Sequence, residues 1–584
     1  MLSKSEFELL RYVCENDYLN DVFSNSPEYK VSQKAELKAL QDKGYIDLNF
    51  HITSSGLAEL ENYRVDNAII LAAGMSTRFI PVSYELPKGL ISVKGDVLIE
   101  RLIEQLLETG VRQIVVVVGY MMEKFLYLRE KYNVKLVVNN EFATKNTHSS
   151  IYVARDYLRN TYICCSDNYY PKNPFHRYEY RAFYCSVFLP GVSYVERAFT
   201  FDEDGLIIDT NKPSHDQWIM YGHAYFDSQF SGKFKPILES YFGRPGVENM
   251  YWENVYAENV KELPLYIHQC QPGEILEFDS MDDLKAFDKD YILHNRVKVF
   301  ENISKVLHCE PSAIEDIVSI KKGLNNRSFK FRCNGAYYVY RHPGVNAANV
   351  IDRKHEATSL RIAKELKIDD TLLYVDEEEG WKISRYIDTT EVFDFANKRH
   401  VQMLAGHLKK LHDSNISVGF CFDYSTEADK LIEYIKHTDG TAYRGLVAQR
   451  EAIRPVLDLL EKDKWQVSLC HNDIYEPNLL IEGEQLYLID WEFAGDSDIG
   501  YDICKLFSLQ SPKYEELDDW LYLYYGRKTT KAEKLHLLAC AAIIYYYWFV
   551  WAVYVSKNGE SISEYMMLWY DRMNHFRDEV LHQL

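Results

Sequence analysis

Hydrophobic residues along the chain change their spacing twice, and each change predicts the start of a new structural unit. In residues 1–65, a helical pattern over residues 36–40 ends at Gly44 and passes into a short strand. A further helix is expected within residues 52–57, behind a Thr or Ser cap. The first unit is therefore predicted to run helix, helix, strand, turn, and then strand or helix.

Between residues 66 and 292, short apolar runs alternate with segments of helical period. Residues 68–71 and 114–118 are continuous apolar runs, as expected of strands that are buried on both faces, and residues 135–138 are predicted to form another strand. Residues 99–107 have the period of a helix. This alternation predicts a Rossmann-like α/β domain with a mostly parallel sheet, whose binding loops lie at the carboxyl ends of the strands.

A third unit is predicted over residues 293–584. Residues 329–333 and 336–340 can pair as antiparallel strands around Asn334-Gly335, which is a favoured hairpin turn. A helix over residues 354–364 follows, and the remainder is mainly helical. The pattern predicts an α+β domain.

One apolar segment raises the question of a membrane. Residues 535–555 contain no Asp, Glu, Lys or Arg, and they are long enough to cross a hydrocarbon core of about 30 Å. Four tyrosines would then lie in or near the hydrocarbon, namely Tyr545, Tyr546, Tyr547 and Tyr554. A buried core helix is the favoured interpretation, and no membrane span is expected.

Composition narrows the class of protein. A chain of 584 residues is too long for one core. Its formal charge of −21 argues against a general polyanion binder, whereas a nucleotide site needs only a few cations. Eleven scattered cysteines without a CxxC pair, and a start without the apolar core of a signal peptide, favour reduced thiols in the cytoplasm. An oligomer is compatible with the sequence.

The first chemical motif follows the strand at residues 68–71. It is Leu-Ala-Ala-Gly-Met-Ser-Thr-Arg at residues 71–78, with Pro87-Lys88 downstream. A glycine after a strand lets backbone amides approach phosphate, and Arg78 and Lys88 supply positive charge to a transferring phosphoryl group. Arg78 and Lys88 are therefore the predicted catalytic residues. The predicted nucleotide-binding residues of this loop are Leu71, Ala72, Ala73, Gly74, Ser76 and Arg78.

Two separated carboxylates could hold a metal ion between nucleotide and acceptor phosphates. Asp167 follows the strand predicted at residues 162–165, and Asp279 is expected to open a helix. Either Asp alone is more simply a turn or cap residue. As part of this ordered set, both are predicted to be metal ligands.

Residues 67–291 resemble phosphocholine cytidylyltransferases. The resemblance is carried by the loop at residues 71–78 and by residues 166–169, 251–254 and 261–263. Ser76 replaces the second glycine of the family pattern, and Ser83 stands where threonine is usual. The resemblance implies transfer of a cytidylyl group from CTP to a phosphorylated alcohol.

The second chemical motif is His-Asn-Asp-Ile-Tyr-Glu-Pro-Asn at residues 471–478, with Ile-Asp-Trp-Glu at residues 489–492. It resembles the catalytic loop of small-molecule kinases, and residues 297–584 resemble choline kinases and aminoglycoside-phosphotransferase-like kinases. The resemblance implies a protein-kinase-like fold that uses ATP. It also implies that Asp473 accepts the proton of the substrate hydroxyl and that Asn478 and Asp490 hold Mg²⁺.

Further kinase residues are predicted upstream of this loop. Arg341 stands where protein kinases have lysine, as in choline kinases, and Glu356 follows on the predicted helix as its partner. Asn325 belongs to the predicted nucleotide loop at residues 323–328, and Tyr386 to the hinge beside adenine. All four are predicted to bind nucleotide.

A trimethylammonium group is recognised by aromatic faces and a nearby carboxylate. The transferase offers Tyr251, Trp252 and Glu253. The kinase offers Glu492 together with Trp548 and Trp551, which lie on one helical face. Because aromatic residues make up 14% of the chain, composition alone favours core packing for the Trp pair. The family resemblance favours choline.

These predictions combine into a bifunctional enzyme of three domains: a winged-helix-like module at residues 1–65, a nucleotidyltransferase at residues 66–292 and a kinase at residues 293–584. With Mg²⁺, it would phosphorylate choline from ATP and then couple phosphocholine to CTP. One alternative is a sugar kinase joined to a sugar-1-phosphate nucleotidyltransferase. Another is a ligand-sensing transcription regulator, although the acidic charge argues against DNA binding.

Overall fold

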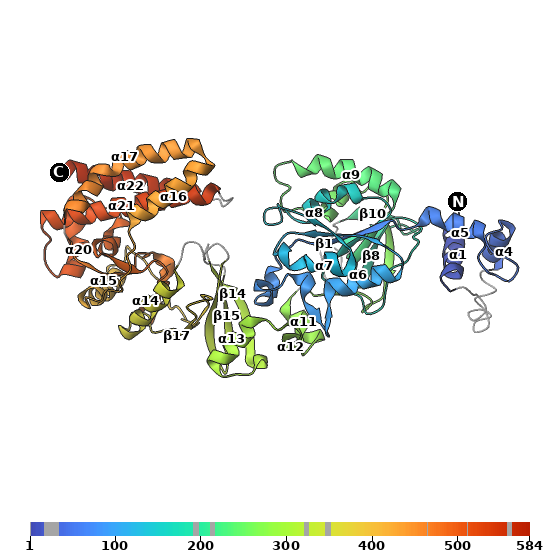
Figure 1. The fold of residues 1–584 in the computed structure, drawn as a ribbon, viewed down its shortest axis with the longest axis horizontal. Coiled ribbons are helices and arrows are strands. Elements are labelled where there is room, and N and C mark those ends of the chain that lie inside the picture. Colours follow the sequence, from blue (N-terminus) through green and yellow to red (C-terminus); the bar gives the residue numbers. More distant parts are fainter. Residues whose placement is uncertain are drawn as a thin grey trace. The chain divides into compact units, whose positions relative to one another are not determined.

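The computed structural model describes residues 2–16, 34–190, 198–210, 217–278, 280–320, 326–344, 352–463, 465–510, 512–557 and 563–584. The chain divides into two compact units, Met1–Asn302 and Ile303–Leu584 (Figure 1). The division falls within helix α13 (Lys298–Leu307), whereas the sequence placed it at residue 292.

The first unit begins with a small helical module. Its described helices are α1 (Lys4–Asn16), α4 (Lys34–Asp42) and α5 (Ser54–Leu60), and an antiparallel bridge joins Ile46 to Ile52. The expected cap of α5 is confirmed, because the Thr53 hydroxyl accepts a hydrogen bond from the Gly56 amide at 3.1 Å.

This module shares its core with the domain that follows. Tyr178 is buried among apolar residues of α1, α4 and α5. The Arg11 guanidinium donates to the Tyr178 carbonyl at 3.2 Å and pairs with Glu179 at 3.4 Å. The module is therefore packed onto the transferase rather than tethered to it.

A nine-stranded sheet forms the centre of this unit, in the order β10-β9-β11-β6-β1-β4-β5 with β8 beside β11 and β12 beside β8. One half is parallel as expected. It contains β1 (Asn67–Ala72), β4 (Gln113–Val118), β5 (Lys135–Val138) and β6 (Thr161–Cys165).

The other half of the sheet differs from the sequence-based expectation. Strand β11 (Gln217–Phe226) runs antiparallel to β6 and β8 and to β9, and β10 is antiparallel to β9, so the sheet is mixed. The bounds are β8 (Phe183–Leu189), β9 (Ala198–Phe201), β10 (Ile207–Thr210) and β12 (Tyr266–Cys270). An apolar strand can pair in either direction, and its connections rather than its apolar pattern decide which pairing forms.

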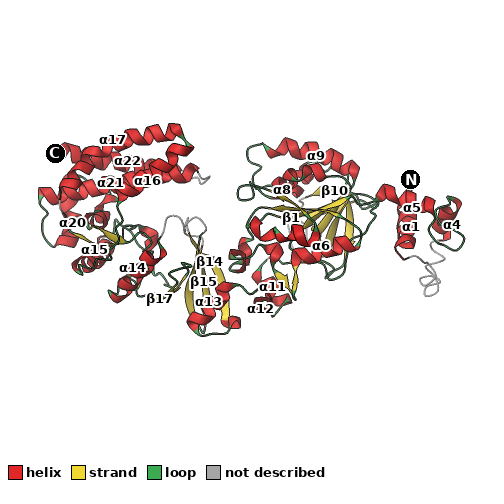
Figure 2. Cartoon of the chain, in the orientation of Figure 1, coloured by secondary structure: helices red, strands yellow, loops and turns green. Residues whose placement is uncertain are grey.

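Helices cover both faces of the sheet, as Figures 1 and 2 show. Along β1, Ala68 and Ile70 belong to one hydrophobic core while Ile69 and Leu71 belong to the other. One face carries α6 (Leu98–Glu108) and α7 (Tyr127–Tyr132), and the other carries α8 (Thr147–Val153), α9 (Ser228–Phe242) and α10 (Trp252–Glu258). The prediction of buried strands with apolar residues on both faces is confirmed for β1.

The second unit begins with a five-stranded antiparallel sheet in the order β14-β15-β16-β18-β17. Its hairpin is confirmed, because Asn334 and Gly335 both have the positive φ that this tight turn needs. The strands are β14 (Ile314–Ile320), β15 (Asn326–Cys333), β16 (Ala336–Pro343), β17 (Leu372–Val375) and β18 (Lys382–Arg385), and α14 (Arg353–Glu365) follows β16.

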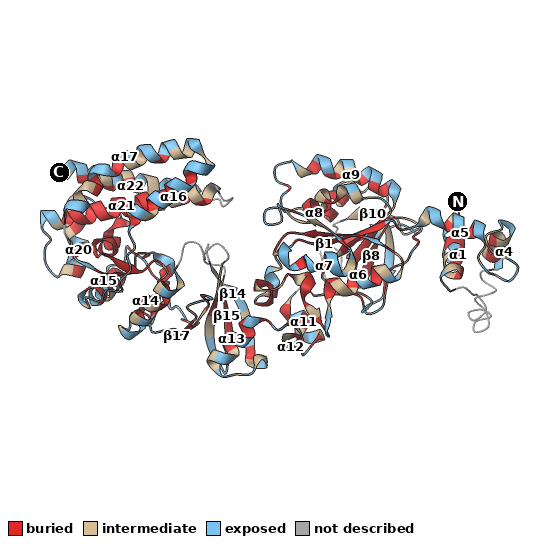
Figure 3. Ribbon diagram, in the orientation of Figure 1, coloured by how far each residue is buried: buried red, intermediate tan, exposed pale blue. Residues whose placement is uncertain are grey.

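A large helical lobe completes this unit. Its long helices are α15 (Lys398–Asp413), α16 (Tyr424–Thr438), α17 (Gly440–Lys462), α21 (Lys531–Lys557) and α22 (Ser563–Gln583). By length and composition α21 could cross a membrane, but 72% of its most apolar window is buried inside the protein. Figure 3 shows α21 lined by buried residues between its neighbours. It is a core helix of this lobe.

Two candidate active sites

A cavity of about 460 Å³ lies where β1 and β6 end, at the edge of the sheet where binding loops were expected. It brings together eight of the predicted site residues from four separate segments. These are Gly74, Ser76, Arg78, Lys88, Asp167, Tyr251, Trp252 and Glu253.

The loop after β1 has the backbone that phosphate binding requires. A Cβ placed on Gly74 would meet no atom within 4 Å, so packing within the protein does not require glycine there, and the backbone stays open to a ligand. Ser76 has φ +52°, the left-handed conformation that glycine adopts most easily. The position at which the family pattern has glycine thus has a backbone conformation that favours glycine. Leu71, Ala72 and Ala73 are buried in the cores and support the loop from below.

Lys88 and Asp167 form an ion pair in this cavity, with Nζ and Oδ2 2.6 Å apart. The Lys88 ammonium also lies 4.8 Å from the centre of the Phe79 ring. Gly89 explains the close approach, because a Cβ at this position would lie 2.8 Å from Ser166, the neighbour of Asp167. Lys88 and Asp167 can thus act on the same phosphate group.

The predicted second carboxylate, Asp279, lies outside the described residues. Two residues before it, Glu277 in β13 (Leu276–Glu277) pairs in register with Asn168 and lines the same cavity. Sequence reasoning missed Glu277, since only the pairing of β13 with β7 (Asn168–Tyr169) brings it beside Asp167.

Aromatic and acidic groups line the wall formed by α10. The Tyr184 hydroxyl donates to Glu253 at 3.0 Å, and the Tyr184 and Trp252 rings meet edge to face at 5.4 Å. Trp252 is only 2% exposed, so most of its ring belongs to the core. Tyr251 is half-buried at the start of α10. Tyr184 is a further member of this wall that the sequence did not indicate.

The second site lies in the second unit, on the loop after β20 (Val467–Cys470). The side-chain amide of Asn478 donates two hydrogen bonds to Asp473. One goes to the main-chain carbonyl at 2.9 Å and the other to the carboxylate at 3.1 Å. Burial and the neighbouring Asp490 raise the pKa of Asp473 to about 7, while Lys505 and Asn478 oppose the rise. Burial and Asp490 also raise the pKa of Glu492 to about 8.

A buried cation network faces this loop. The Arg341 guanidinium pairs with both carboxylate oxygens of Glu356, at 2.5 and 2.7 Å, and donates to the Gly380 carbonyl at 3.2 Å. Burial alone would raise the pKa of Glu356, but Arg341 and Lys382 outweigh it and lower the pKa to about 2. The predicted pairing of Arg341 with Glu356 is present.

Asp490 has the surroundings that a bound cation would suit. Its Oδ1 is buried without a hydrogen-bond donor among the described residues, and Arg341 and Lys382 lie 3.5 and 3.8 Å away. Asn478 and Asp490 both offer the oxygen ligands that Mg²⁺ prefers. The residues present therefore fit a magnesium ion.

The nucleotide contacts predicted for Tyr386 and Asn325 remain predictions. Tyr386 follows β18, where its amide donates to the Tyr337 carbonyl at 3.0 Å and its ring lies 3.8 Å below the Lys330 ammonium. Asn325 lies outside the described residues.

The predicted Trp pair is part of a larger aromatic cluster. The Trp548 ring lies 5.5 Å from Trp551 and 5.7 Å from Trp569. It also meets Phe493 edge to face at 6.1 Å, and Phe493 directly follows Glu492. The cluster therefore reaches the end of the segment that carries Asp490 and Glu492. Sequence reasoning missed Trp569 and Phe493, which only the packing of α21 against α22 and the loop reveals.

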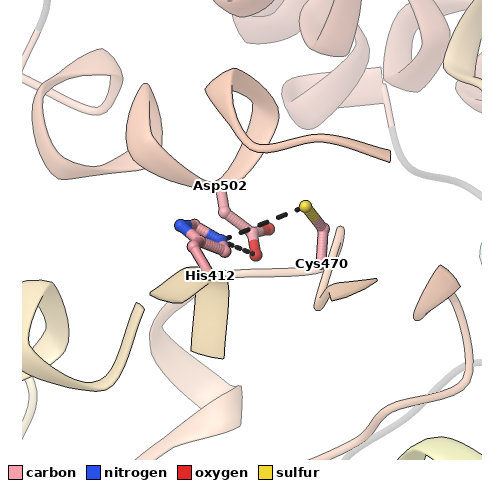
Figure 4. A group of neighbouring side chains, drawn as sticks. All are labelled: His412, Cys470 and Asp502. Carbon is pink, nitrogen blue, oxygen red and sulfur yellow. Dashed lines mark hydrogen bonds and ion pairs between the residues drawn. The ribbon is translucent and has the colours of Figure 1, made fainter. Parts of the chain in front are cut away.

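Beneath the loop, Asp502 lies beside His412 and Cys470 (Figure 4). Its carboxylate accepts hydrogen bonds from the His471 and Asn472 amides at 2.8 and 2.9 Å and contacts His412 at 3.3 Å. Burial raises the pKa of the Cys470 thiol well above its usual value. The cluster anchors the catalytic loop.

Two families match separate parts of the chain. The MobA-like NTP transferase domain family matches residues 68–175, and the Choline/ethanolamine kinase family matches residues 317–534.

Known proteins match each half. Choline-phosphate cytidylyltransferase of Streptococcus pneumoniae is 34% identical over 222 residues, which are 38% of this chain and 96% of the relative. The 2-aminoethylphosphonate cytidylyltransferase of Lancefieldella rimae is 37% identical over 235 residues, which are 40% of this chain and 95% of the relative. The crystal structure of choline kinase LicA from Streptococcus pneumoniae is 21% identical and covers 50% of this chain and 99% of that chain, with a TM-score of 0.42.

The first half thus covers nearly the whole length of cytidylyltransferases to which it is more than 30% identical. The second half contains the matched kinase family. The chain belongs to the cytidylyltransferase family that includes choline-phosphate cytidylyltransferase, and it carries a choline/ethanolamine kinase domain as well.

Proposed function

We propose that this chain makes CDP-choline from choline in two consecutive reactions. The observation that carries the proposal is the presence of two phosphate-handling sites on one chain, one with Lys88 paired to Asp167 and one with Asp473 held by Asn478. Each site also has aromatic and acidic groups close by, which suit a quaternary ammonium.

In the kinase reaction, the choline hydroxyl lies at Asp473, which accepts its proton as the oxygen attacks the γ-phosphorus of ATP. The bond between the γ-phosphorus and the bridging oxygen breaks, and ADP leaves with the electron pair. Arg341 is held in place by Glu356 and directs positive charge toward the phosphates. Asn478 and Asp490 would hold Mg²⁺, which neutralises phosphate charge when it is bound.

In the transferase reaction, a phosphate oxygen of phosphocholine attacks the α-phosphorus of CTP, and pyrophosphate leaves with the electron pair. The attacking phosphate is already ionised, so this site needs charge stabilisation rather than a strong base. Arg78 and Lys88 supply it, and the Gly74 loop presents its backbone to the nucleotide phosphates. Asp167, with Asp279, would hold the metal ion.

The similarity to a 2-aminoethylphosphonate cytidylyltransferase supports a second candidate acceptor, an aminoethyl phosphonate or phosphate. Such an acceptor carries a primary ammonium, which favours hydrogen-bonding carboxylates over aromatic faces. Purified protein should be supplied with CTP, Mg²⁺ and equal amounts of phosphocholine, phosphoethanolamine and 2-aminoethylphosphonate. We expect mass spectrometry to detect mainly CDP-choline, and predominance of another product would replace the proposed acceptor.

The role of the aromatic cluster can be measured directly. Trp548→Ala should raise the KM for choline about two- to thirtyfold with little change in the KM for ATP, the loss expected of a cation–π contact of about 0.5–2 kcal/mol. Trp548→Phe should restore most of the affinity, and Trp520→Ala, a half-buried Trp of the same lobe, serves as the control. Equal increases in both KM values would indicate core packing instead.

We propose that the N-terminal module is winged-helix-like and serves as an interaction module in a cytoplasmic protein. Its short Ile46–Ile52 bridge between helices supports this assignment, and the free state of the cysteines supports a reducing compartment.

The full-length protein is expected to bind duplex DNA only weakly and without sequence preference at physiological salt, because the chain carries a net charge of −21. A gel-shift assay with a randomised duplex library tests this expectation. Tight binding of a selected sequence would revive the transcription-regulator alternative.

A further inference from the structure

We propose that residues 288–299, the segment that leads out of the transferase, form a clasp that positions the catalytic Lys88, with Glu85 and Asn295 as the positioning residues. This inference rests on the proposed cytidylyl transfer. The clasp lies outside the residues matched by the transferase family and ahead of those matched by the kinase family. It includes α12 (Tyr291–Asn295) and the start of α13.

One contact of the clasp lies just before Lys88 in the chain. The Glu85 carboxylate accepts hydrogen bonds from the backbone amides of Lys298 and Val299, at 2.9 and 2.8 Å. These amides belong to the first turn of α13 and have no partner within the helix. A single carboxylate therefore fixes the start of α13 to the segment that carries Lys88.

The second contact lies just after Lys88. The Asn295 side chain accepts from the Ser92 amide at 2.7 Å and donates to the Ser92 carbonyl at 2.9 Å. The same side-chain amide donates to the Tyr291 carbonyl at 2.7 Å, which fixes its orientation. Asn295 is 9% exposed, so water competes little for these bonds.

A third group of contacts joins Lys94 to the same segment. The Lys94 amide donates to the Asp288 carboxylate at 2.7 Å, and the same carboxylate oxygen lies 2.7 Å from the His294 ring. The Lys94 ammonium lies 3.7 Å from the centre of the Phe287 ring. The chain on both sides of Lys88 is thus bonded to one short segment, through the Glu85 side chain before Lys88 and through the main chain of Ser92 and Lys94 after it.

The position of the Lys88 segment matters for catalysis because Lys88 and Gly89 both make close contacts. The Lys88 ammonium must keep its 2.6 Å contact with Asp167 while Gly89 passes close to Ser166. A displacement of about 1 Å at a reacting group can cost about a hundredfold in rate. A loosened segment would therefore lower the catalytic rate before it weakened nucleotide binding.

The test uses the full chain with CTP and phosphocholine supplied. Glu85→Ala should lower kcat for CDP-choline formation about tenfold or more and leave the KM for CTP within about threefold. Glu85→Gln keeps an oxygen acceptor and should recover part of kcat. Asn295→Asp keeps the hydrogen bond from the Ser92 amide but cannot donate to the Ser92 carbonyl. It should therefore also lower kcat for CDP-choline formation. Phosphorylation of choline by the same samples should be unchanged.

Asp227→Ala is the matched control, because this carboxylate also accepts two backbone amides, from Phe230 at 2.8 Å and Ala182 at 3.0 Å. Amide hydrogen exchange over residues 86–93 should accelerate in Glu85→Ala and not in Asp227→Ala. Amide hydrogen exchange does not depend on which acceptor substrate the transferase uses. It therefore separates failure of the clasp from failure of the proposed function. Unchanged exchange and kcat in Glu85→Ala, or an equal loss of kcat in Asp227→Ala, would overturn the proposal.

Discussion

Replacement of Asp473 by Asn is expected to reduce choline phosphorylation about 10²- to 10⁴-fold, the usual contribution of a general base. The amide preserves the shape of the side chain and its place beside Asn478, but it cannot accept the hydroxyl proton. Because the sites lie in separate units, CDP-choline synthesis from supplied phosphocholine and CTP should continue at the normal rate. Steady-state assays of both half-reactions measure the effect.

A control must separate this effect from the loss of a buried carboxylate. Asp369→Asn makes the same change in the kinase unit, at a carboxylate that accepts hydrogen bonds from the Thr371 amide and hydroxyl. This variant should keep both activities. If Asp473→Asn stopped both half-reactions in a folded protein, the claim of two separable sites would be wrong.

The reciprocal result is expected at Lys88. Lys88→Ala should reduce CDP-choline formation about 10²- to 10³-fold, because it removes a positive charge from a site that must stabilise a transferring phosphoryl group. It also leaves Asp167 without its 2.6 Å partner. Phosphocholine should then accumulate when choline, ATP and CTP are supplied together, and mass spectrometry of the mixture would detect it.

Lys131→Ala provides the matched control for this charge removal. Lys131 forms an ion pair of similar length with Glu100, at 2.8 Å, but it is about half exposed and lies outside the cavity. An exposed pair of this kind contributes at most about 1 kcal/mol to stability. Normal pyrophosphate release by folded Lys88→Ala protein would remove Lys88 from the catalytic set.

Local features were predictable where a residue type is tied to a backbone conformation. The turn at Asn334-Gly335 was predicted because few residues tolerate positive φ, and both residues adopt it. The helix at residues 535–555 was predicted to be buried because its phenols suit a protein core better than lipid, and most of its length is buried. The strand before Gly74 was predicted from its unbroken apolar run and is β1.

Features that depend on pairing between distant segments were not predictable. Glu277 reaches the transferase cavity only because β13 pairs with β7. The antiparallel pairing in one half of the sheet also depends on distant segments, because an apolar strand can pair in either direction. Phe493 and Trp569 likewise join the aromatic cluster through the packing of the helical lobe.

By itself the sequence determined the chemistry of this protein: a glycine loop with Arg78 and Lys88, and a kinase loop with Asp473 and Asn478. Short motifs suffice for this because each reaction needs particular groups at close spacing along the chain. Only the tertiary structure decided how these groups are held, through Asp502 beneath the kinase loop and Glu85 beside Lys88. Such supporting bonds join residues that are remote in sequence, and their strength comes from burial, which only the folded chain provides.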